Sequence, residues 1–322
     1  MSNETYGPDS VNPEEFMPNN NQVGPKITGN IPPEVAARLQ GKKNQNFSQQ
    51  EPQLRVTGSS KLEELLSNIQ NITNNYEKIT LPSLGKFYNG EDGPTDGILH
   101  VRPMTGKEES ILATPRFVKK GDAISMIFKN CIKENYQPEN FLSVDRTYLL
   151  IWLRGVSYGN NYQVELTCPF TNKKFNENID LNLDVDLCPD DFDESSLSGV
   201  LPTTGYNFTY RLSRGKDETS LQTRREKDAK FDKKPNETDD TLIIRTAQLV
   251  ESIEGLTDKT ELEVLIKNLP VSDGNHLRNL VNDPPFGVQT KLTVISPFAA
   301  DEFEVELPID SSFFFPRRQK TK

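Results

Sequence analysis

Two short turns in the sequence have the composition of half a zinc-binding knuckle. Cys168 and Ser296 each begin a Pro-Phe turn between stretches that alternate apolar and polar residues, which predicts a β-hairpin around each turn. A zinc ribbon holds its ion with two cysteines three residues apart in such a turn. Here the positions three residues further on are Thr171 and Ala299. We therefore expect zinc-ribbon-like hairpins that hold no metal, and we expect no cofactor elsewhere.

A Gly-Lys pair followed by acidic residues occurs at 106–107 and again at 215–216. A phosphate-binding P-loop needs a second glycine five residues earlier and a Ser or Thr after the lysine. Glu108 and Asp217 follow the lysines instead, and their charge would repel phosphate. We interpret both segments as structural turns whose acids cap a helix or bond a neighbouring backbone.

Few residues of the chain are suited to any other catalytic chemistry. The two histidines, His100 and His276, lie in no recognisable motif, and no catalytic residue is predicted. A hydrolase that uses carboxylates such as Glu108 and Asp217 stays open as an alternative, since sequence alone cannot select a catalytic pair among so many acids.

The most regular feature of the sequence is an internal repeat. Residues 145–180 and 273–308 align without gaps, with six identities in 36 positions where average composition gives roughly two. Upstream, residues 98–109 align with residues 207–218. Matching apolar residues fall where a helix face and alternating strands would bury them. We therefore predict an α+β fold made by tandem duplication of a helix-plus-hairpin unit, packed about a pseudo-twofold axis.

The repeat and the changes in composition divide the chain into six predicted segments. The first is polar and rich in Asn and Pro, so we expect a disordered or extended arm. The segments are a polar, flexible N-terminal arm (1–60), an amphipathic helix with a turn-rich connector (61–97), a first repeat (98–182), an acidic linker (183–206), a second repeat (207–309) with a charged insertion near 219–240, and an aromatic, basic C-terminal tail (310–322).

Hydrophobic spacing predicts the helices that surround the turns. Aliphatic residues at helical spacing predict an amphipathic helix over 60–78. Asp122 and Asp240 are expected to begin two further helices, the second of which runs over 241–255. A short helix is expected over 259–268.

Two further acids stand at matching positions in the aligned repeats. Asp145 and Asp273 each precede a helical pattern, and we expect each to cap the helix that follows.

Charge and composition limit the classes of partner. The chain has 37 basic and 47 acidic residues, a formal net charge of −10, which disfavours a binder of duplex nucleic acid. Three cysteines suit a reducing compartment, and no stretch has the length of a membrane span. The N-terminus lacks the charged and apolar regions of a signal peptide. A nucleic-acid-handling module built on the degenerate zinc-ribbon-like hairpins is the alternative function.

The C-terminal segment carries three adjacent aromatic residues, Phe313, Phe314 and Phe315, before a basic tail. Three neighbouring side chains of a strand cannot all face one core, because side chains alternate. At least one of them is expected to contact another layer or a partner. The alternative, that they pack inside against the second repeat, stays open.

Several stretches resemble the baseplate hub assembly proteins of T-even (T4-type) contractile-tailed bacteriophages. The stretches are LPSLGKFYNG, LHVRPMTGKEESILATPRFVKKGDAISMIFKNCI and DRTYLLIWLRGVSYG, and the likeness is most specific over residues 80–182. It extends through the second repeat to DSSFFFP, and it does not cover the first 60 residues.

The resemblance implies a non-enzymatic protein that helps to build the hub of the tail baseplate, either as a virion subunit or as an assembly chaperone. It implies other baseplate and hub proteins as partners, in the host cytoplasm during assembly or in the tail baseplate of the virion; a homo-oligomer is left open, and neither nucleic acid nor membrane is expected. Glu108 matches the family's acidic turn, which makes it the first candidate for an interaction residue. The other candidates are Lys107, Asp217, Phe313, Phe314 and Phe315.

Overall fold

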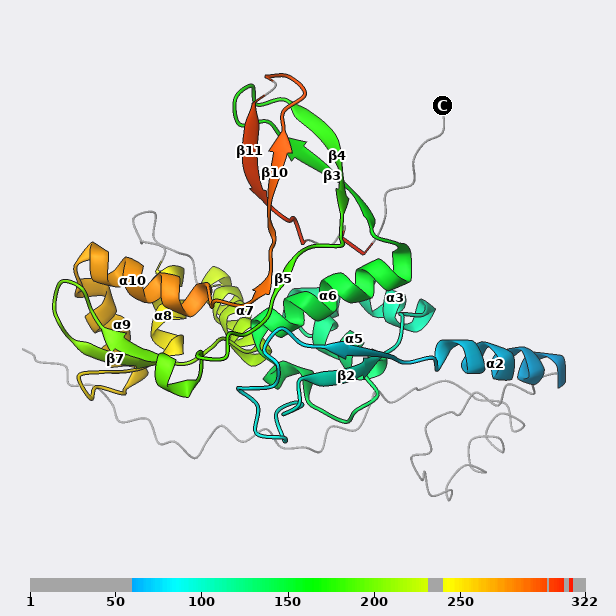
Figure 1. The fold of residues 1–322 in the computed structure, drawn as a ribbon, viewed down its shortest axis with the longest axis horizontal. Coiled ribbons are helices and arrows are strands. Elements are labelled where there is room, and N and C mark those ends of the chain that lie inside the picture. Colours follow the sequence, from blue (N-terminus) through cyan, green and yellow to red (C-terminus); the bar gives the residue numbers. More distant parts are fainter. Residues whose placement is uncertain (1–59, 231–239, 300, 310–312, 315–322) are drawn as a thin grey trace, which may run out of the picture. The chain divides into compact units, whose positions relative to one another are not determined.

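The computed structural model describes residues 60–230, 240–299, 301–309 and 313–314 (Figure 1). These residues form helices and small antiparallel sheets, so the predicted α+β class is confirmed. The predicted arm before Ser60 lies outside the described residues, as do parts of the predicted insertion and tail. In the part of the chain that is described, no helix is long and apolar enough to cross a membrane.

Helices and a two-stranded sheet precede the first hairpin. In chain order they are α2 (Ser60–Thr73), β1 (Glu77–Thr80), β2 (Ile98–Val101), α3 (Gly106–Leu112), α4 (Pro115–Lys120), α5 (Ala123–Cys131), the 3-10 helix η2 (Pro138–Asn140) and α6 (Ser143–Tyr158). Strands β1 and β2 pair antiparallel, with Ile79 opposite Leu99. The predicted hairpin follows as β3 (Asn161–Thr167) and β4 (Lys174–Asp180).

The second half also combines helices, short sheets and a final hairpin. Its elements are β5 (Val185–Asp186), the 3-10 helix η3 (Glu194–Ser196), β6 (Ser198–Val200), β7 (Asn207–Tyr210), α7 (Gly215–Lys230), α8 (Thr241–Leu249), β8 (Val250–Ile253), α9 (Lys259–Asn268), α10 (Val271–Asn282), β9 (Gly287–Val288), β10 (Lys291–Ile295) and β11 (Glu302–Glu306). Strands β6, β7 and β8 form an antiparallel sheet, and β5 pairs with β9. The segment predicted as a linker thus supplies strands to two sheets.

The helix predicted over 241–255 is shorter than expected. It ends at Leu249, and Val250–Ile253 forms strand β8 beside β7. Val250 and Ile253 are buried while Glu251 between them is exposed. Residues of β-branched type pack well on a pleated surface, and the free side of β7 gives them a partner, so pairing overrides the helical spacing.

The other helix predictions have mixed outcomes. The helix expected over 60–78 ends at Thr73, and the chain enters strand β1 at Glu77. The helix expected over 259–268 is confirmed as α9. Asp122 and Asp240 do begin α5 and α8, although neither side chain makes a capping hydrogen bond. The charged residues 219–230 continue helix α7 rather than forming a loop.

The core is one connected cluster of buried apolar side chains drawn from both halves of the described chain. It includes Leu99 and Phe128 from the first half and Phe208 and Leu249 from the second. Phe313 near the C-terminus joins the same cluster. Elements of the two halves therefore fold against one another.

Candidate functional site

A buried ion pair holds the first Gly-Lys turn. Arg102 Nη2 donates to Glu108 Oε1 at 3.1 Å, and Glu108 is fully buried. Glu108 Oε2 accepts from the backbone N and the hydroxyl of Thr105, both at 2.8 Å, which closes a capping box at the start of α3. Burial opposes ionisation, but the bonds from Arg102 and Thr105 outweigh it and lower the pKa of Glu108.

The second Gly-Lys turn has a matching pair. Arg211 makes a two-pronged bond with Asp217, in which Nη1 meets Oδ2 and Nη2 meets Oδ1, both at 2.7 Å. The backbone N of Arg214 and the side chain of Gln248 also donate to Asp217, at 2.9 and 3.0 Å. Burial opposes ionisation here too, and these bonds lower the pKa of Asp217.

Each arginine also binds the end of a helix. Arg102 Nη2 donates to the carbonyl of Asn130 near the end of α5, and Arg211 Nη2 donates to the carbonyl of Gln248 near the end of α8. Each pair thus joins the end of a strand, the start of one helix and the end of another. Glu108 and Asp217 are held by separate arginines, and Lys107, which directly precedes Glu108, is exposed.

Two buried aspartates hold turns that are distant in sequence. Asp145 Oδ1 accepts from the backbone N of Ser83 at 3.0 Å, and its Oδ2 accepts from the Tyr88 hydroxyl at 2.7 Å. Asp273 accepts from the backbone N of Thr203 at 2.8 Å and from the backbone N and hydroxyl of Thr204 at 3.0 and 2.8 Å. Each carboxylate therefore stabilises a turn that precedes its helix by more than 60 residues.

The predicted capping role of Asp145 and Asp273 is wrong. Residues Leu142 and Pro270 occupy the N-cap positions of α6 and α10, and each aspartate lies in the first turn with its side chain directed elsewhere. A signal for the true contact exists in the sequence. Leu-Pro-x-x-Gly occurs at 81–85 and again at 201–205, and both copies form the turns that these acids bind.

The environment of Asp145 predicts an unusual pH dependence of stability. Burial raises the pKa of Asp145 to about 6, despite the bonds from Ser83 and Tyr88. The folded protein then binds a proton more tightly than the unfolded chain, so this group's contribution falls as pH rises from about 4 to about 6. Relative to Asp145→Asn, the wild-type free energy of unfolding should fall by about 3 kcal/mol over that range. Urea unfolding at a series of pH values measures it.

Asp273→Asn provides the matched control for this measurement. Hydrogen bonds from Thr204 and Thr203 outweigh burial and lower the pKa of Asp273, so its contribution is lost only as pH falls below the normal aspartate range. The difference between wild type and Asp273→Asn should stay constant from pH 5 to pH 7. A wild-type to Asp145→Asn difference that is equally constant would contradict the prediction.

The two Pro-Phe turns meet at a buried contact. Cys168 Sγ lies 3.1 Å from Ser296 Oγ, and both side chains are buried. Ser296 Oγ also accepts from the backbone N of Phe298 and Ala299, each at 3.2 Å. Burial raises the pKa of Cys168, but bonds from Ser296 and the turn backbone outweigh it and lower the value to about 7. Among the described residues, no group of three or more His, Cys, Asp or Glu is placed to hold a metal.

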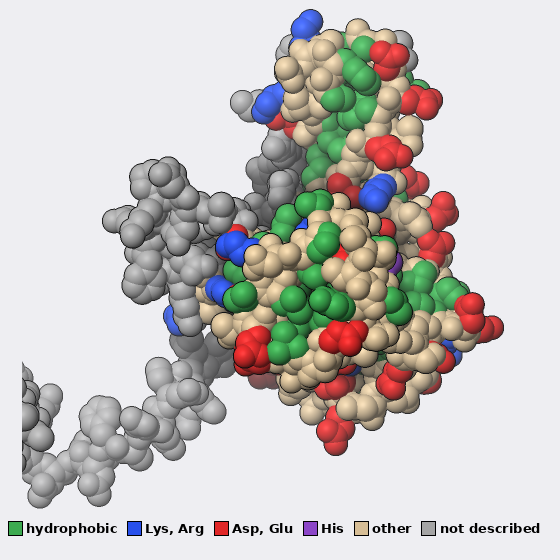
Figure 2. All heavy atoms as spheres, turned by 90° about the vertical axis from the view of Figure 1, so that its left-hand side faces the viewer, with side chains coloured by type: hydrophobic (Ala, Val, Ile, Leu, Met, Phe, Trp, Pro, Cys, Tyr) green, Lys and Arg blue, Asp and Glu red, His purple; other side chains and the backbone are tan. Residues whose placement is uncertain are grey.

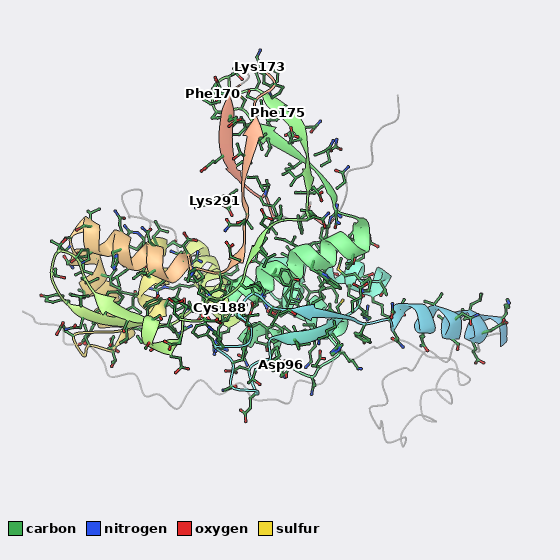
Figure 3. The ribbon with its side chains drawn as sticks, viewed as in Figure 1. Asp96, Phe170, Lys173, Phe175, Cys188 and Lys291 are labelled. Atoms are coloured by element: carbon green, nitrogen blue, oxygen red, sulfur yellow. The ribbon has the colours of Figure 1, made fainter. Side chains whose placement is uncertain are left out.

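Four phenylalanine rings surround this contact at the ends of the hairpins. Phe170 meets Phe303 and Phe298 meets Phe175, both edge to face with ring centroids 6.2 Å apart. Phe175 and Phe303 meet each other at 6.4 Å. Figure 3 shows Phe170 and Phe175 together at the turn end of β3 and β4. Phe170 aligns with Phe298 in the repeat, and Phe175 aligns with Phe303. The contact of Phe170 with Phe303 therefore matches the contact of Phe298 with Phe175.

The predicted aromatic residues of the C-terminal segment lie inside the protein. Phe313 and Phe314 are buried, and the Phe313 ring lies 5.0 Å from that of Tyr162. Arg154 Nε donates to the Phe313 carbonyl at 2.7 Å, and Arg154 is itself buried. These two side chains are therefore packed inside, but Phe313 contacts Tyr162 and Arg154 of the predicted first repeat, whereas the alternative had placed the aromatic residues against the second. Phe315 lies outside the described residues.

An open groove of about 990 Å³ lies between α5, η2 and α7. Two of the cationic side chains that line it already have partners. Lys129 donates to Asn135, and Arg224 makes a two-pronged bond with Glu263. The groove therefore offers mixed polar contacts and no cluster of reactive groups.

Helix α2 carries a stripe of apolar side chains that are exposed to solvent. Leu65, Leu66 and Ile69 are each about half exposed, and Leu62 is 39% exposed. A helix of this length is marginal in water by itself. The stripe that sequence spacing predicted is therefore present, and residues 61–70 of the helix are exposed.

Buried charges in this fold join strands, turns and helix ends. The family model described as T4 bacteriophage base plate protein matches residues 73–314. The chain belongs to this family, and a structural role in the phage baseplate follows from it. No curated protein and no solved structure matches the chain.

Proposed function

We propose that this chain builds the baseplate hub through protein–protein contacts, either as a subunit of the virion or as an assembly chaperone, and that it performs no catalysis. The match to the T4 baseplate family over residues 73–314 carries this proposal, because it covers nearly all of the described fold. The resemblance to hub assembly proteins over residues 80–182 supports the assignment to the hub.

The use of buried polar groups supports a role in contacts rather than in chemistry. Glu108 and Asp217 are tied to arginines and have lowered pKa values, so neither suits the role of a general acid near neutral pH. Exposed apolar side chains on α2 and at the hairpin ends provide surface for partners. The nucleic-acid alternative gains no support from the family match.

Quantitative mass spectrometry of infected cells tests the proposal. A hub subunit is expected in finished particles at a fixed ratio to other baseplate proteins, whereas a chaperone is expected in assembly intermediates and absent from finished particles. Crosslinks from the chain to hub proteins would support the hub assignment. Recovery of the chain with no tail component in either fraction would overturn the proposal.

We also propose that the body is a tandem duplication whose hairpins derive from a zinc ribbon. The paired contacts of Arg102 and Arg211, the reciprocal phenylalanine contacts and the two Leu-Pro-x-x-Gly turns support the duplication. The turn contacts support the ribbon origin, since Ser296 Oγ accepts from the two backbone N–H groups that follow it in the turn, as the first ligand of a knuckle does.

Restoring the missing cysteines should restore a metal site. The triple substitution Thr171→Cys, Ser296→Cys and Ala299→Cys places four thiolates around the Cys168 contact, which suits tetrahedral Zn²⁺. We expect one Zn²⁺ per chain after dialysis, measured by plasma mass spectrometry, and a thiolate charge-transfer band with Co²⁺.

Two controls make the metal experiment decisive. Adding Cys168→Ser to the triple variant leaves three thiolates, so Co²⁺ affinity and the thiolate charge-transfer band should both weaken, and the wild-type chain should take up no Zn²⁺ at this place. A folded triple variant that binds neither ion would contradict the ribbon origin of the hairpins.

A further inference from the structure

The turn end of the two hairpins forms an exposed apolar tip. Phe170 is 53% exposed, Phe298 45% and Ile295 61%, although each belongs to a well-ordered turn or strand. Figure 2 shows hydrophobic side chains gathered along the hairpins, with charged side chains beside them. Large apolar side chains grouped in this way are typical of surfaces that bind another protein.

The tip is held rigid from beneath. The buried contact between Cys168 and Ser296 joins the two turns, and the inner rings of Phe175 and Phe303 pack against each other. A surface that is ordered before binding loses little conformational freedom when it docks. The exposed rings are therefore presented in a fixed arrangement.

Charges at the tip are opposite on the two hairpins. Lys173 and Lys174 follow the first turn, and Asp301 and Glu302 occupy the aligned positions after the second. All four side chains are exposed. Lys174 bonds Glu165 at 2.8 Å on its own hairpin, and Lys173 lies over the Phe298 ring at 5.4 Å. For the described residues, no ion pair is recorded between the lysines and these two acids.

We propose that the tips of two copies of this chain dock on each other about a twofold axis. A twofold interface requires a surface that complements itself, so that each residue meets a different residue of the other copy. The axis would place Lys173 and Lys174 at the turn of one copy against Asp301 and Glu302 of the second, twice. The half-exposed rings of Phe170 and Phe298 would meet in the centre of the interface.

The opposite charges favour a second copy over an unrelated partner. A different protein that offered only an apolar pocket would not require lysines on one hairpin and acids at the aligned positions of the other. Stable specific interfaces bury roughly 1,200 Å² or more, and a contact centred on the exposed side chains of Phe170, Phe298 and Ile295 belongs to the weak class. Such a contact gains strength when several copies are held together in one assembly. The proposal does not depend on the baseplate assignment.

Charge exchange in the full-length chain tests the docking. Sedimentation velocity from about 10 μM to about 1 mM covers the range expected for a weak dimer. The wild-type chain should dimerise as concentration rises. The variant Lys173→Glu/Lys174→Glu and the variant Asp301→Lys/Glu302→Lys should each dimerise at least about tenfold more weakly, because like charges then face each other. An equimolar mixture of the two should recover dimers at wild-type strength.

Two further variants separate docking from folding. Phe170→Ala/Phe298→Ala should remove dimerisation while the chain stays folded and its thermal unfolding midpoint falls by only several degrees, since both rings are about half exposed. Lys291→Glu is the matched control, because Lys291 lies at the other end of the same hairpin (Figure 3), and it should dimerise like the wild type. A wild-type chain that stays monomeric over the whole range, or a dimer that all tip variants retain, would overturn the proposal.

Discussion

Glu108→Gln is expected to lower the free energy of unfolding by about 3 to 5 kcal/mol. Removing one partner of a buried ion pair has this cost because the other charge stays buried without compensation. Arg102 is only 12% exposed in its side chain, and its remaining partners are the carbonyls of Pro103 and Asn130. The same substitution weakens the capping box with Thr105. Chemical denaturation followed by circular dichroism measures the change.

Two comparisons identify the cause of the loss. Lys107→Gln changes the neighbouring, exposed residue and should alter stability by no more than about 0.5 kcal/mol. Asp217→Asn should have a smaller effect than Glu108→Gln, about 1 to 3 kcal/mol, because Arg211 is 30% exposed and water can replace part of the pair. Equal unfolding midpoints for Glu108→Gln and Lys107→Gln would contradict a structural role for the buried pair.

Phe313→Ala is expected to lower the free energy of unfolding by about 3 to 5 kcal/mol as well. Truncating a fully buried aromatic side chain removes its transfer free energy and leaves a cavity. The Phe313 ring packs against Tyr162 and Phe314, with ring centroids 5.0 and 5.3 Å away. The bond from Arg154 to the Phe313 carbonyl involves the backbone and can persist, so the expected loss comes from packing.

Phe170→Ala is the matched control for this substitution. It truncates the same type of side chain at a place that is 53% exposed, so the loss should stay near 1 kcal/mol. Thermal unfolding of both variants gives the comparison. If Phe313→Ala were as stable as Phe170→Ala, the C-terminal segment would not be part of the cooperative fold.

Prediction from sequence was most successful where structure depends on residues a few positions apart. The α+β class, the hairpins around Pro-Phe turns and helix α9 follow from side-chain spacing and turn residues. The same spacing failed over Val250–Ile253, because a short apolar run suits a helix or a strand. The strand forms because residues 250–253 pair with the edge of β7, a contact that the local sequence does not show.

In the candidate site, too, local features were predicted from the sequence and long-range contacts were not. Sequence patterns identified Glu108 and Asp217 as acids in matching turns, and a P-loop was excluded from the residues alone. Their pairing with Arg102 and Arg211 was not predicted, although each pair spans six residues. A strand and a helix must first be placed in contact before such an arginine can face its acid, and long-range packing determines that placement.

The sequence by itself determined that this protein is acidic, repeats a helix-and-hairpin pattern and resembles phage baseplate proteins. These properties reside in residue types and their order. Only the tertiary structure decided that Asp145 holds the turn at Ser83, that Phe313 lies in the core and that the Phe170 ring stays half exposed. Burial is a property of elements brought together from distant parts of the chain, since each side chain loses water only when its neighbours arrive.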